Sequence, residues 1–212
     1  HLAAETDLEF CEENPERAYA TNTIGCQNIV YLARKLLIPI IYISTAGVFD
    51  GTKKTAYKIN DFPNPINIYG RSKYYGEIFI EKFGMHWIIR AGWMMGGGPE
   101  VDKKFVNKII QKIFDGHKII NVCDDSIGSP TYTKDLVFNI KKLIERKKKF
   151  YGIHHCAGGG QATRFEVATE IVKLLGTKTE IVGVPTIEVG KEFPCVRSSN
   201  EVLVNTLPMR HW

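Results

Sequence analysis

Short runs of aliphatic and β-branched residues alternate with helical patterns along this chain, and this alternation limits its fold more than any other feature. Each run has the length of a strand buried on both faces. The expected strands are Ile38–Ser44, His86–Ala91, Lys118–Cys123, Gly152–Gly158 and Thr179–Val184. The expected helices are Pro15 to about Leu37, Ile68–Phe83, Val101–Asp115, one that Thr133 caps, and Thr163–Leu175 with a Thr-x-x-Glu capping box. This order predicts an α/β fold with a doubly wound, largely parallel sheet.

The composition is that of an ordinary globular protein with one large core or two modest ones, since 44% of the 212 residues are hydrophobic and 24% are charged. The net charge of +5 comes partly from Glu145–Phe150, whose lysines follow an expected helix and complement its dipole. No aromatic-rich basic stripe accompanies this run, so we expect no nucleic-acid partner. The longest apolar run, Leu36–Ile43, is far shorter than a membrane span, so we expect no membrane association.

Five cysteines without a C-x-x-C spacing argue against disulfides and structural zinc, and they fit a reducing cytoplasm. The adjacent His154 and His155 lie in an expected strand, where they would point to opposite faces. We therefore expect no metal site.

Two tyrosine–lysine pairs have the i, i+4 spacing of neighbours on a helix, Tyr31 with Lys35 and Tyr69 with Lys73. Ligands of open parallel sheets bind outside the carboxyl ends of the strands, where the following helices begin. Tyr31 and Lys35 lie near the end of their helix, at the opposite edge. Tyr69 and Lys73 begin a helix that follows a strand, so this pair is the candidate site.

The candidate pair has the chemistry of a proton donor. A free tyrosine titrates near 10, and a lysine one helical turn away would lower the pKa of Tyr69 towards neutrality. Thr45 follows the strand before this helix and offers a hydroxyl to orient a carbonyl oxygen. Thr45 could also simply cap the loop.

Several motifs in sequence order extend this pattern: "NPERAYATNTIGCQN", "STAGVFDG", "YGRSK" and "GSPTYTKDL". Together they resemble the extended short-chain dehydrogenase/reductase family over essentially the whole chain, and within it the nucleotide-sugar reductases of the dTDP-4-dehydrorhamnose reductase type. The resemblance implies a Rossmann-like core in residues 1–91 and 117–162, and a smaller substrate-binding lobe in residues 92–116 and 163–212.

The resemblance also implies roles for individual residues. Thr45, Tyr69 and Lys73 match the catalytic hydroxyl, the proton donor and the lysine, which would also hold the nicotinamide ribose of NADPH or NADH. The residues implied to line the cofactor are Ala3, Ala4, Thr6, Tyr69, Lys73 and Ala91, and those implied for the sugar are Thr45 and Trp93. The indole of Trp93 could equally be a packing residue.

Two departures from the family pattern affect these expectations. Reductases of this type usually carry Asp-Tyr after the threonine, where this chain has Ala46–Gly47, so the identity of the sugar is open. The glycine-rich dinucleotide loop is absent, and neither the glycines near Gly96 nor those near Gly158 have its spacing. We therefore expect roughly 60 upstream residues, the size of two βα units, without which residues 1–212 would be inactive.

The leading expectation is NAD(P)H-dependent reduction of a keto group on a nucleotide sugar in dTDP-rhamnose biosynthesis. A sugar epimerase stays open, because it uses the same three residues. A 4,6-dehydratase is disfavoured, because Ala46 and Gly47 supply no acid. From a different class, a non-catalytic regulatory subunit resembling that of methionine adenosyltransferase stays open. The expected partners are a nucleotide-sugar substrate and, as an open alternative to a monomer, a second copy in a homodimer.

Overall fold

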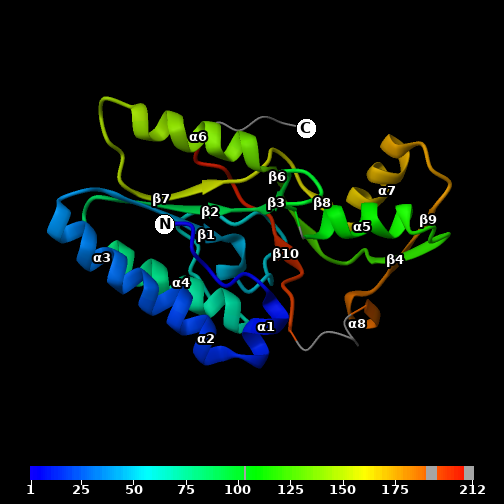
Figure 1. The fold of residues 1–212 in the computed structure, drawn as a ribbon, viewed down its shortest axis with the longest axis horizontal. Coiled ribbons are helices and arrows are strands. Elements are labelled where there is room, and N and C mark those ends of the chain that lie inside the picture. Colours follow the sequence, from blue (N-terminus) through cyan, green and yellow to red (C-terminus); the bar gives the residue numbers. More distant parts are fainter. Residues whose placement is uncertain (103, 190–194, 208–212) are drawn as a thin grey trace.

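The larger lobe is built on a parallel sheet. The computed structural model describes residues 1–102, 104–189 and 195–207 (Figure 1). In this lobe the strands β1 (Ile40–Thr45), β2 (His86–Ala91) and β7 (Gly152–Cys156) lie in the order β1–β2–β7. β1 and β2 run parallel, with Thr45 opposite Ala91. Every residue of β2 is buried, as expected for a central strand covered on both faces. The predicted parallel arrangement is confirmed.

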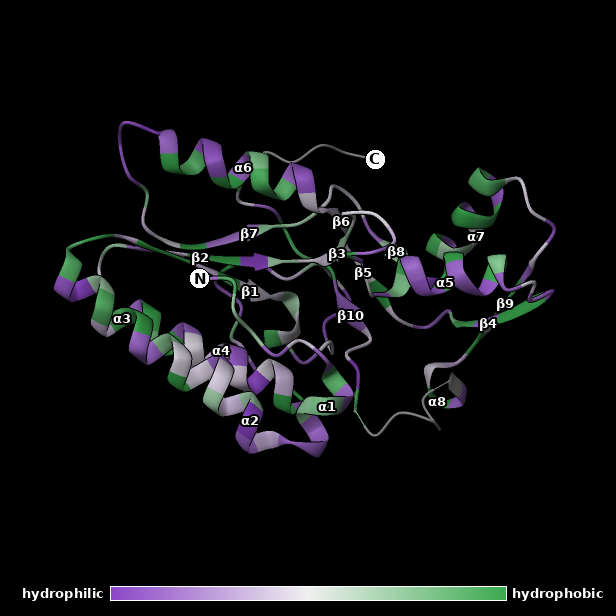
Figure 2. Cartoon of the chain, in the orientation of Figure 1, coloured by the Kyte–Doolittle hydropathy of each residue, from purple (hydrophilic) through white to green (hydrophobic). Residues whose placement is uncertain are grey.

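Helices cover both faces of this sheet. α3 (Gly25–Leu36) and α4 (Ile68–Glu81) lie on one face, and α6 (Thr133–Glu145) lies on the other (Figure 1). Figure 2 shows the hydrophobic side of α6 turned towards the sheet, where Leu136 and Leu143 are buried against Trp87 and Ile89 of β2. On the opposite face, Val30 and Ile80 pack against Tyr42. The doubly wound α/β class is therefore confirmed.

The first helical segment is more divided than its apolar spacing predicts. It comprises α1 (Leu8–Glu13), α2 (Pro15–Tyr19), the π-helical turn η1 (Ala20–Ile24) and α3. A π turn adds one residue to a helical turn without interrupting the apolar pattern, so the spacing does not reveal it. α3 ends with Leu37 in the left-handed region at φ 55°.

The smaller lobe has its own core. It contains the parallel pair β4 (Ile119–Cys123) and β9 (Glu180–Val184), with α5 (Phe105–Phe114), α7 (Arg164–Leu175) and α8 (Thr186–Val189). The predicted capping box is present, because Thr163 and Glu166 exchange hydrogen bonds at the start of α7. The buried residues that form the core of the smaller lobe are Ile109, Ile113, Ile120, Val122, Ala168 and Ile171. Residues 103, 190–194 and 208–212 of the segments expected to form the substrate-binding lobe lie outside the described residues.

Short elements connect the two lobes. They are η2 (Ala46–Val48), β3 (Trp93–Met95), β5 (Ile127–Gly128), β6 (Pro130–Tyr132), β8 (Ala162–Thr163) and β10 (Asn200–Glu201). After Pro185 the chain forms the short elements α8 and β10, which could not be predicted because elements of four and two residues show no detectable periodicity. The prediction that Thr133 caps α6 was wrong. β6 leads straight into the helix, so the extended Tyr132 is the cap residue.

Across residues 1–102, 104–189 and 195–207, no helix has both the length and the apolar character needed to cross a membrane.

Tyr31 lies on the outer surface of α3 with 72% of its area exposed, at the edge of the sheet opposite to Tyr69. The Tyr31–Lys35 pair is therefore a surface pair.

Candidate active site

Helix α4 approaches the end of β1 closely, and two glycines make this approach possible. The side chain of Asn67 caps the helix by accepting from the Gly70 N–H at 2.8 Å. A Cβ atom on Gly70 would lie 2.2 Å from the Gly47 carbonyl oxygen, and one on Gly76 would lie 2.6 Å from the Asn22 carbonyl oxygen. Any side chain at these positions would push α4 outward. The sequence thus brings the first turns of α4 against the carboxyl end of β1.

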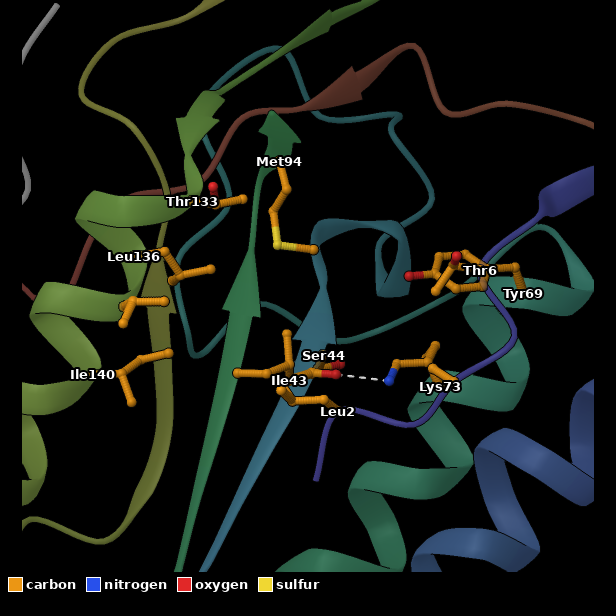
Figure 3. A pocket seen from close by; sticks show the side chains of 12 residues that line it. Leu2, Thr6, Ile43, Ser44, Tyr69, Lys73, Met94, Thr133, Leu136 and Ile140 are labelled. Atoms are coloured by element: carbon orange, nitrogen blue, oxygen red, sulfur yellow. Dashed lines mark hydrogen bonds between the residues drawn. The ribbon is translucent and has the colours of Figure 1, made fainter. Parts of the chain in front are cut away.

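A cleft of about 230 Å³ opens between α4, the N-terminal segment and α6 (Figure 3). Tyr69, Lys73 and Thr6 lie on one side of it, and Met94 and residues of α6 lie on the other. Its lining residues are Leu2, Ala4, Thr6, Ile43, Ser44, Tyr69, Lys73, Met94, Thr133, Leu136, Val137 and Ile140. The apolar wall that α6 contributes was not predicted from the sequence, because apolar residues of a helix are normally interpreted as part of the hydrophobic core.

Tyr69 and Thr45 form the reactive end of this arrangement. Thr45 ends β1, and its side chain lies close enough to the Tyr69 phenol to affect the pKa of Tyr69. Burial raises this pKa to about 12, the neighbouring Thr45 hydroxyl opposes the shift, and the negative charge of Glu201 adds to it. The phenol is therefore protonated at neutral pH, as a proton donor must be.

Lys73 is a buried cation that contacts the backbone of β1. Its ammonium donates to the Ile43 carbonyl oxygen at 2.7 Å (Figure 3). The same ammonium lies 4.1 Å from the centre of the Tyr42 ring. Burial lowers the pKa of Lys73 to about 8, while the nearby Cys26 and Glu77 oppose the shift. The expected lowering of the Tyr69 pKa is not found, because burial outweighs other influences on the phenol.

The other predicted residues are placed around this cleft. Ala4 and Thr6 line it, whereas Ala3 is exposed beside them. Ala91 is buried at the end of β2, paired in register with Thr45 on one side and with Cys156 on the other. Trp93 lies further out, at the start of β3. The structure thus brings together Ala4, Thr6, Tyr69 and Lys73 in the cleft, with the Thr45 side chain beside Tyr69.

Asn22 fixes the N-terminal loop to α4, and this role was not predicted from the sequence. Its amide nitrogen donates to the Glu5 carbonyl oxygen at 3.0 Å and to the Ser72 hydroxyl at 2.9 Å, and its amide oxygen accepts from the Glu5 N–H at 2.8 Å. The side chain is 1% exposed. A polar residue among the apolar positions of an expected helix was the available signal, but the π turn that orients it was not predictable.

Trp93 forms a stacked unit with two charged residues. Its indole N–H donates to the carboxylate of Glu201, and the Arg164 guanidinium lies 3.9 Å from the centre of its ring. The ring also packs directly on Gly128, where a Cβ atom would lie 2.2 Å from it. Neither Glu201 nor Arg164 was predicted from the sequence. Within residues 1–102, 104–189 and 195–207, no group of three or more histidine, cysteine, aspartate or glutamate side chains has the arrangement of a metal site.

Comparison with known proteins identifies the family to which the chain is similar. Residues 1–207 match the family described as RmlD substrate binding domain. Spore coat polysaccharide biosynthesis protein SpsK of Bacillus subtilis is 33% identical over 99% of this chain and 74% of its own length. A dTDP-4-dehydrorhamnose reductase of Mycolicibacterium smegmatis is 34% identical over 86% of this chain, and the match spans only 55% of that protein.

Two further similarities bear on the function. Methionine adenosyltransferase 2 subunit beta of Xenopus laevis is 30% identical over 79% of this chain and 51% of its own length. The crystal structure of dTDP-4-dehydrorhamnose reductase from Bacillus anthracis in complex with NADP is 33% identical, has a TM-score of 0.90, and covers 97% of this chain and 71% of its own. The match over residues 1–207 shows that this chain belongs to the RmlD substrate binding domain family.

Proposed function

We propose that the protein containing this chain reduces a keto group on a nucleotide sugar with NADPH or NADH, as a dTDP-4-dehydrorhamnose reductase of dTDP-rhamnose biosynthesis. The observation that carries this proposal is that Tyr69 and Lys73 line one cleft at the carboxyl end of β1, where the Thr45 side chain lies beside the Tyr69 phenol. The family match and the relatives named as dTDP-sugar reductases support it.

The cleft suits the nicotinamide end of such a cofactor. Its α6 wall is apolar, with Leu136 and Ile140, while Tyr69 and Lys73 supply polar groups from α4. An apolar wall can hold a ring face, and the Lys73 ammonium can bond to ribose hydroxyls. Ala4, Thr6 and Ala91 would surround this end. A bound reduced nicotinamide would supply the hydride.

Two side chains of this chain would orient and protonate the oxygen of the substrate carbonyl. The Thr45 hydroxyl orients that oxygen, and Tyr69 gives its proton to the alkoxide formed as hydride reaches the carbon. The sum of one hydride and one proton converts the ketone to an alcohol. The high pKa of Tyr69 keeps the proton on the phenol until the more basic alkoxide forms.

The smaller lobe would hold the rest of the sugar nucleotide, with Trp93 at its border. We propose that this lobe includes β4, because β4 pairs with β9 in its core. The cytoplasm is the proposed compartment, supported by the five cysteines, which form no disulfide within the described residues. A homodimer is the proposed assembly, supported by the apolar side chains of Leu32 and Leu36 that α3 exposes, and sedimentation of the purified protein tests it.

The regulatory subunit remains the second candidate, because the similarity to methionine adenosyltransferase 2 subunit beta favours it. An epimerase would retain its cofactor and consume none. The deciding experiment supplies the full-length protein with NADPH and dTDP-4-dehydrorhamnose and follows loss of the reduced-nicotinamide absorbance. We expect stoichiometric oxidation of NADPH with formation of the reduced sugar. Binding of both ligands without turnover would overturn the reductase in favour of a regulatory role.

A further inference from the structure

Glu201 brings a carboxylate to the candidate active site from the far end of the described chain. It lies in β10, which pairs in parallel with β5. The neighbouring Asn200 fixes this strand, because its amide donates to the carbonyl oxygens of Lys53 at 2.6 Å and Thr55 at 3.2 Å. The position of Glu201 is therefore set by backbone contacts on both sides, as required of a residue that must hold a defined geometry.

The two carboxylate oxygens of Glu201 have different surroundings. Oε2 accepts from the indole N–H of Trp93, whose ring is held by Gly128 and by the stacked Arg164. Oε1 faces Gly47. A Cβ atom on Gly47 would lie 3.5 Å from Oε1 and 3.4 Å from the Thr45 hydroxyl oxygen. Oε1 and the Thr45 hydroxyl therefore border the same space, and the absence of a side chain at Gly47 leaves it open.

A carboxylate beside a carbonyl that gains negative charge during reduction would oppose that reaction unless it bonded to another part of the substrate. An ionised carboxylate can only accept hydrogen bonds. A partner in this space must therefore be a donor, and the donors of a neutral sugar are its hydroxyl groups. The same charge repels a sugar carboxylate, because two like charges within a few ångströms disfavour each other.

We propose that Glu201 is a specificity-determining residue whose Oε1 accepts a hydrogen bond from a sugar hydroxyl next to the keto carbon, so that the site takes neutral keto sugars and rejects uronates. The proposal rests on the proposed function, since it assumes a nucleotide-linked keto sugar at Thr45 and Tyr69. Trp93 and Arg164 act through Glu201, by holding its other oxygen in place.

The test separates the sugar from the nucleotide. In the full-length protein with NADP, calorimetry measures Kd for dTDP, for dTDP-glucose and for a dTDP-linked uronate, in the wild type and in Glu201→Gln. Glutamine keeps an oxygen for the Trp93 N–H but removes the charge. We expect the affinity for dTDP-glucose to fall about tenfold, the size of one hydrogen bond to a charged group, while the affinity for dTDP stays unchanged. Binding of the uronate should improve.

The control is Glu180→Gln, which removes an exposed carboxylate from β9 of the same lobe and should alter none of the three constants. Equal dTDP-glucose to dTDP ratios in the wild type and Glu201→Gln would overturn the proposal. So would a parallel loss of both affinities with a lowered melting temperature, since that pattern belongs to a packing role. A wild type that binds no dTDP-linked sugar would instead overturn the proposed function, on which this proposal rests.

Discussion

The ammonium of Lys73 donates a hydrogen bond of 2.7 Å to the carbonyl oxygen of Ile43, two residues before Thr45 on β1. This contact joins α4 to the strand that carries the candidate hydroxyl. It also places a positive charge where only 3% of the side chain is exposed. Lys73 is therefore a buried cation, and its titration has consequences for both stability and activity.

Lys73 should lose its proton near pH 8, and this gives opposite effects on activity and stability. Burial lowers its pKa to about 8 from an ordinary 10.5. Between these values the unfolded chain holds more protons than the folded chain, so the free energy of unfolding should rise with pH. NADPH-dependent reduction should fall in the same range, because the Lys73 charge is lost. Rate profiles and urea titrations from pH 7 to about 10.5 measure both.

The matched variant for this prediction is Lys73→Met, which should abolish the rise in stability with pH and also the reductase activity. Lys35→Met, on the exposed end of α3, should leave both profiles as in the wild type. A wild-type stability curve that stayed flat from pH 8 upward would show that Lys73 keeps an ordinary pKa.

Removal of the Tyr69 hydroxyl should slow turnover by about 10²- to 10⁴-fold, the usual contribution of a positioned general acid. Tyr69→Phe keeps the ring, so KM and the Kd for NADPH should change little. Steady-state kinetics and fluorescence titration provide these values. Tyr31→Phe is the control and should be almost silent, because Tyr31 lies exposed on α3. Equal effects of both variants would contradict the assignment of Tyr69.

The parts of this fold that the sequence predicts are those with a regular pattern. The buried strand His86–Ala91 is found with the predicted bounds, and the Thr163–Glu166 capping box is present. Both depend on residues close together in the sequence, where periodicity and capping chemistry are readable. The choice of Tyr69 over Tyr31 followed from a topological rule for parallel sheets, and the structure places Tyr69 in a cleft and Tyr31 on the outer surface.

The parts that escape the sequence depend on distant contacts. Glu201 contacts Trp93 across a separation of 108 residues, and it comes from a strand of two residues that has no period to detect. The π turn orients the Asn22 side chain towards Glu5 and Ser72, and the spacing of apolar residues in the sequence does not predict such a turn. The departure from the family pattern at Ala46–Gly47 is visible in the sequence, but the position of the Glu201 carboxylate beside Gly47 is visible only in the structure.

The buried ion pair between Arg90 and Glu77 should make a large contribution to the free energy of unfolding. Arg90 donates to both oxygens of Glu77, at 3.1 and 2.7 Å, and these residues are 2% and 1% exposed. Glu77→Gln would leave the guanidinium buried without a counter-charge, so the free energy of unfolding should fall by about 3–5 kcal/mol. Chemical denaturation measures this loss.

The control is Glu81→Gln, one helical turn further along α4, where the side chain is exposed. It should change stability by less than about 0.5 kcal/mol, as surface substitutions generally do. A loss below about 1 kcal/mol in Glu77→Gln would mean that the buried charge finds another partner.

Truncation of Trp93 should affect the sugar end of the site more than the cofactor end. Trp93→Ala removes the N–H that holds Glu201 and the ring on which Arg164 stacks. The Kd for a dTDP-linked sugar should therefore rise several-fold more than the Kd for NADPH, as measured by calorimetry. Equal losses of both affinities, together with a lowered melting temperature, would show that the indole serves packing alone.

The last prediction concerns His155, which is fully buried in β7 beside Arg90. Burial, and then the positive charge of Arg90, lower the pKa of His155 from 6.5 to about 4. Between these pH values the unfolded chain binds a proton that the folded chain refuses, so the free energy of unfolding should decrease as the pH falls. The shift corresponds to about 3 kcal/mol.

Because carboxyl groups titrate in the same pH range, the effect of His155 on stability is isolated by comparing variants. His155→Gln should flatten the decrease between pH 6.5 and 4, whereas His154→Gln, which changes the neighbouring and partly exposed residue, should keep the wild-type slope. Identical slopes in the wild type and His155→Gln would show that His155 accepts a proton as readily in the folded protein as in the unfolded chain.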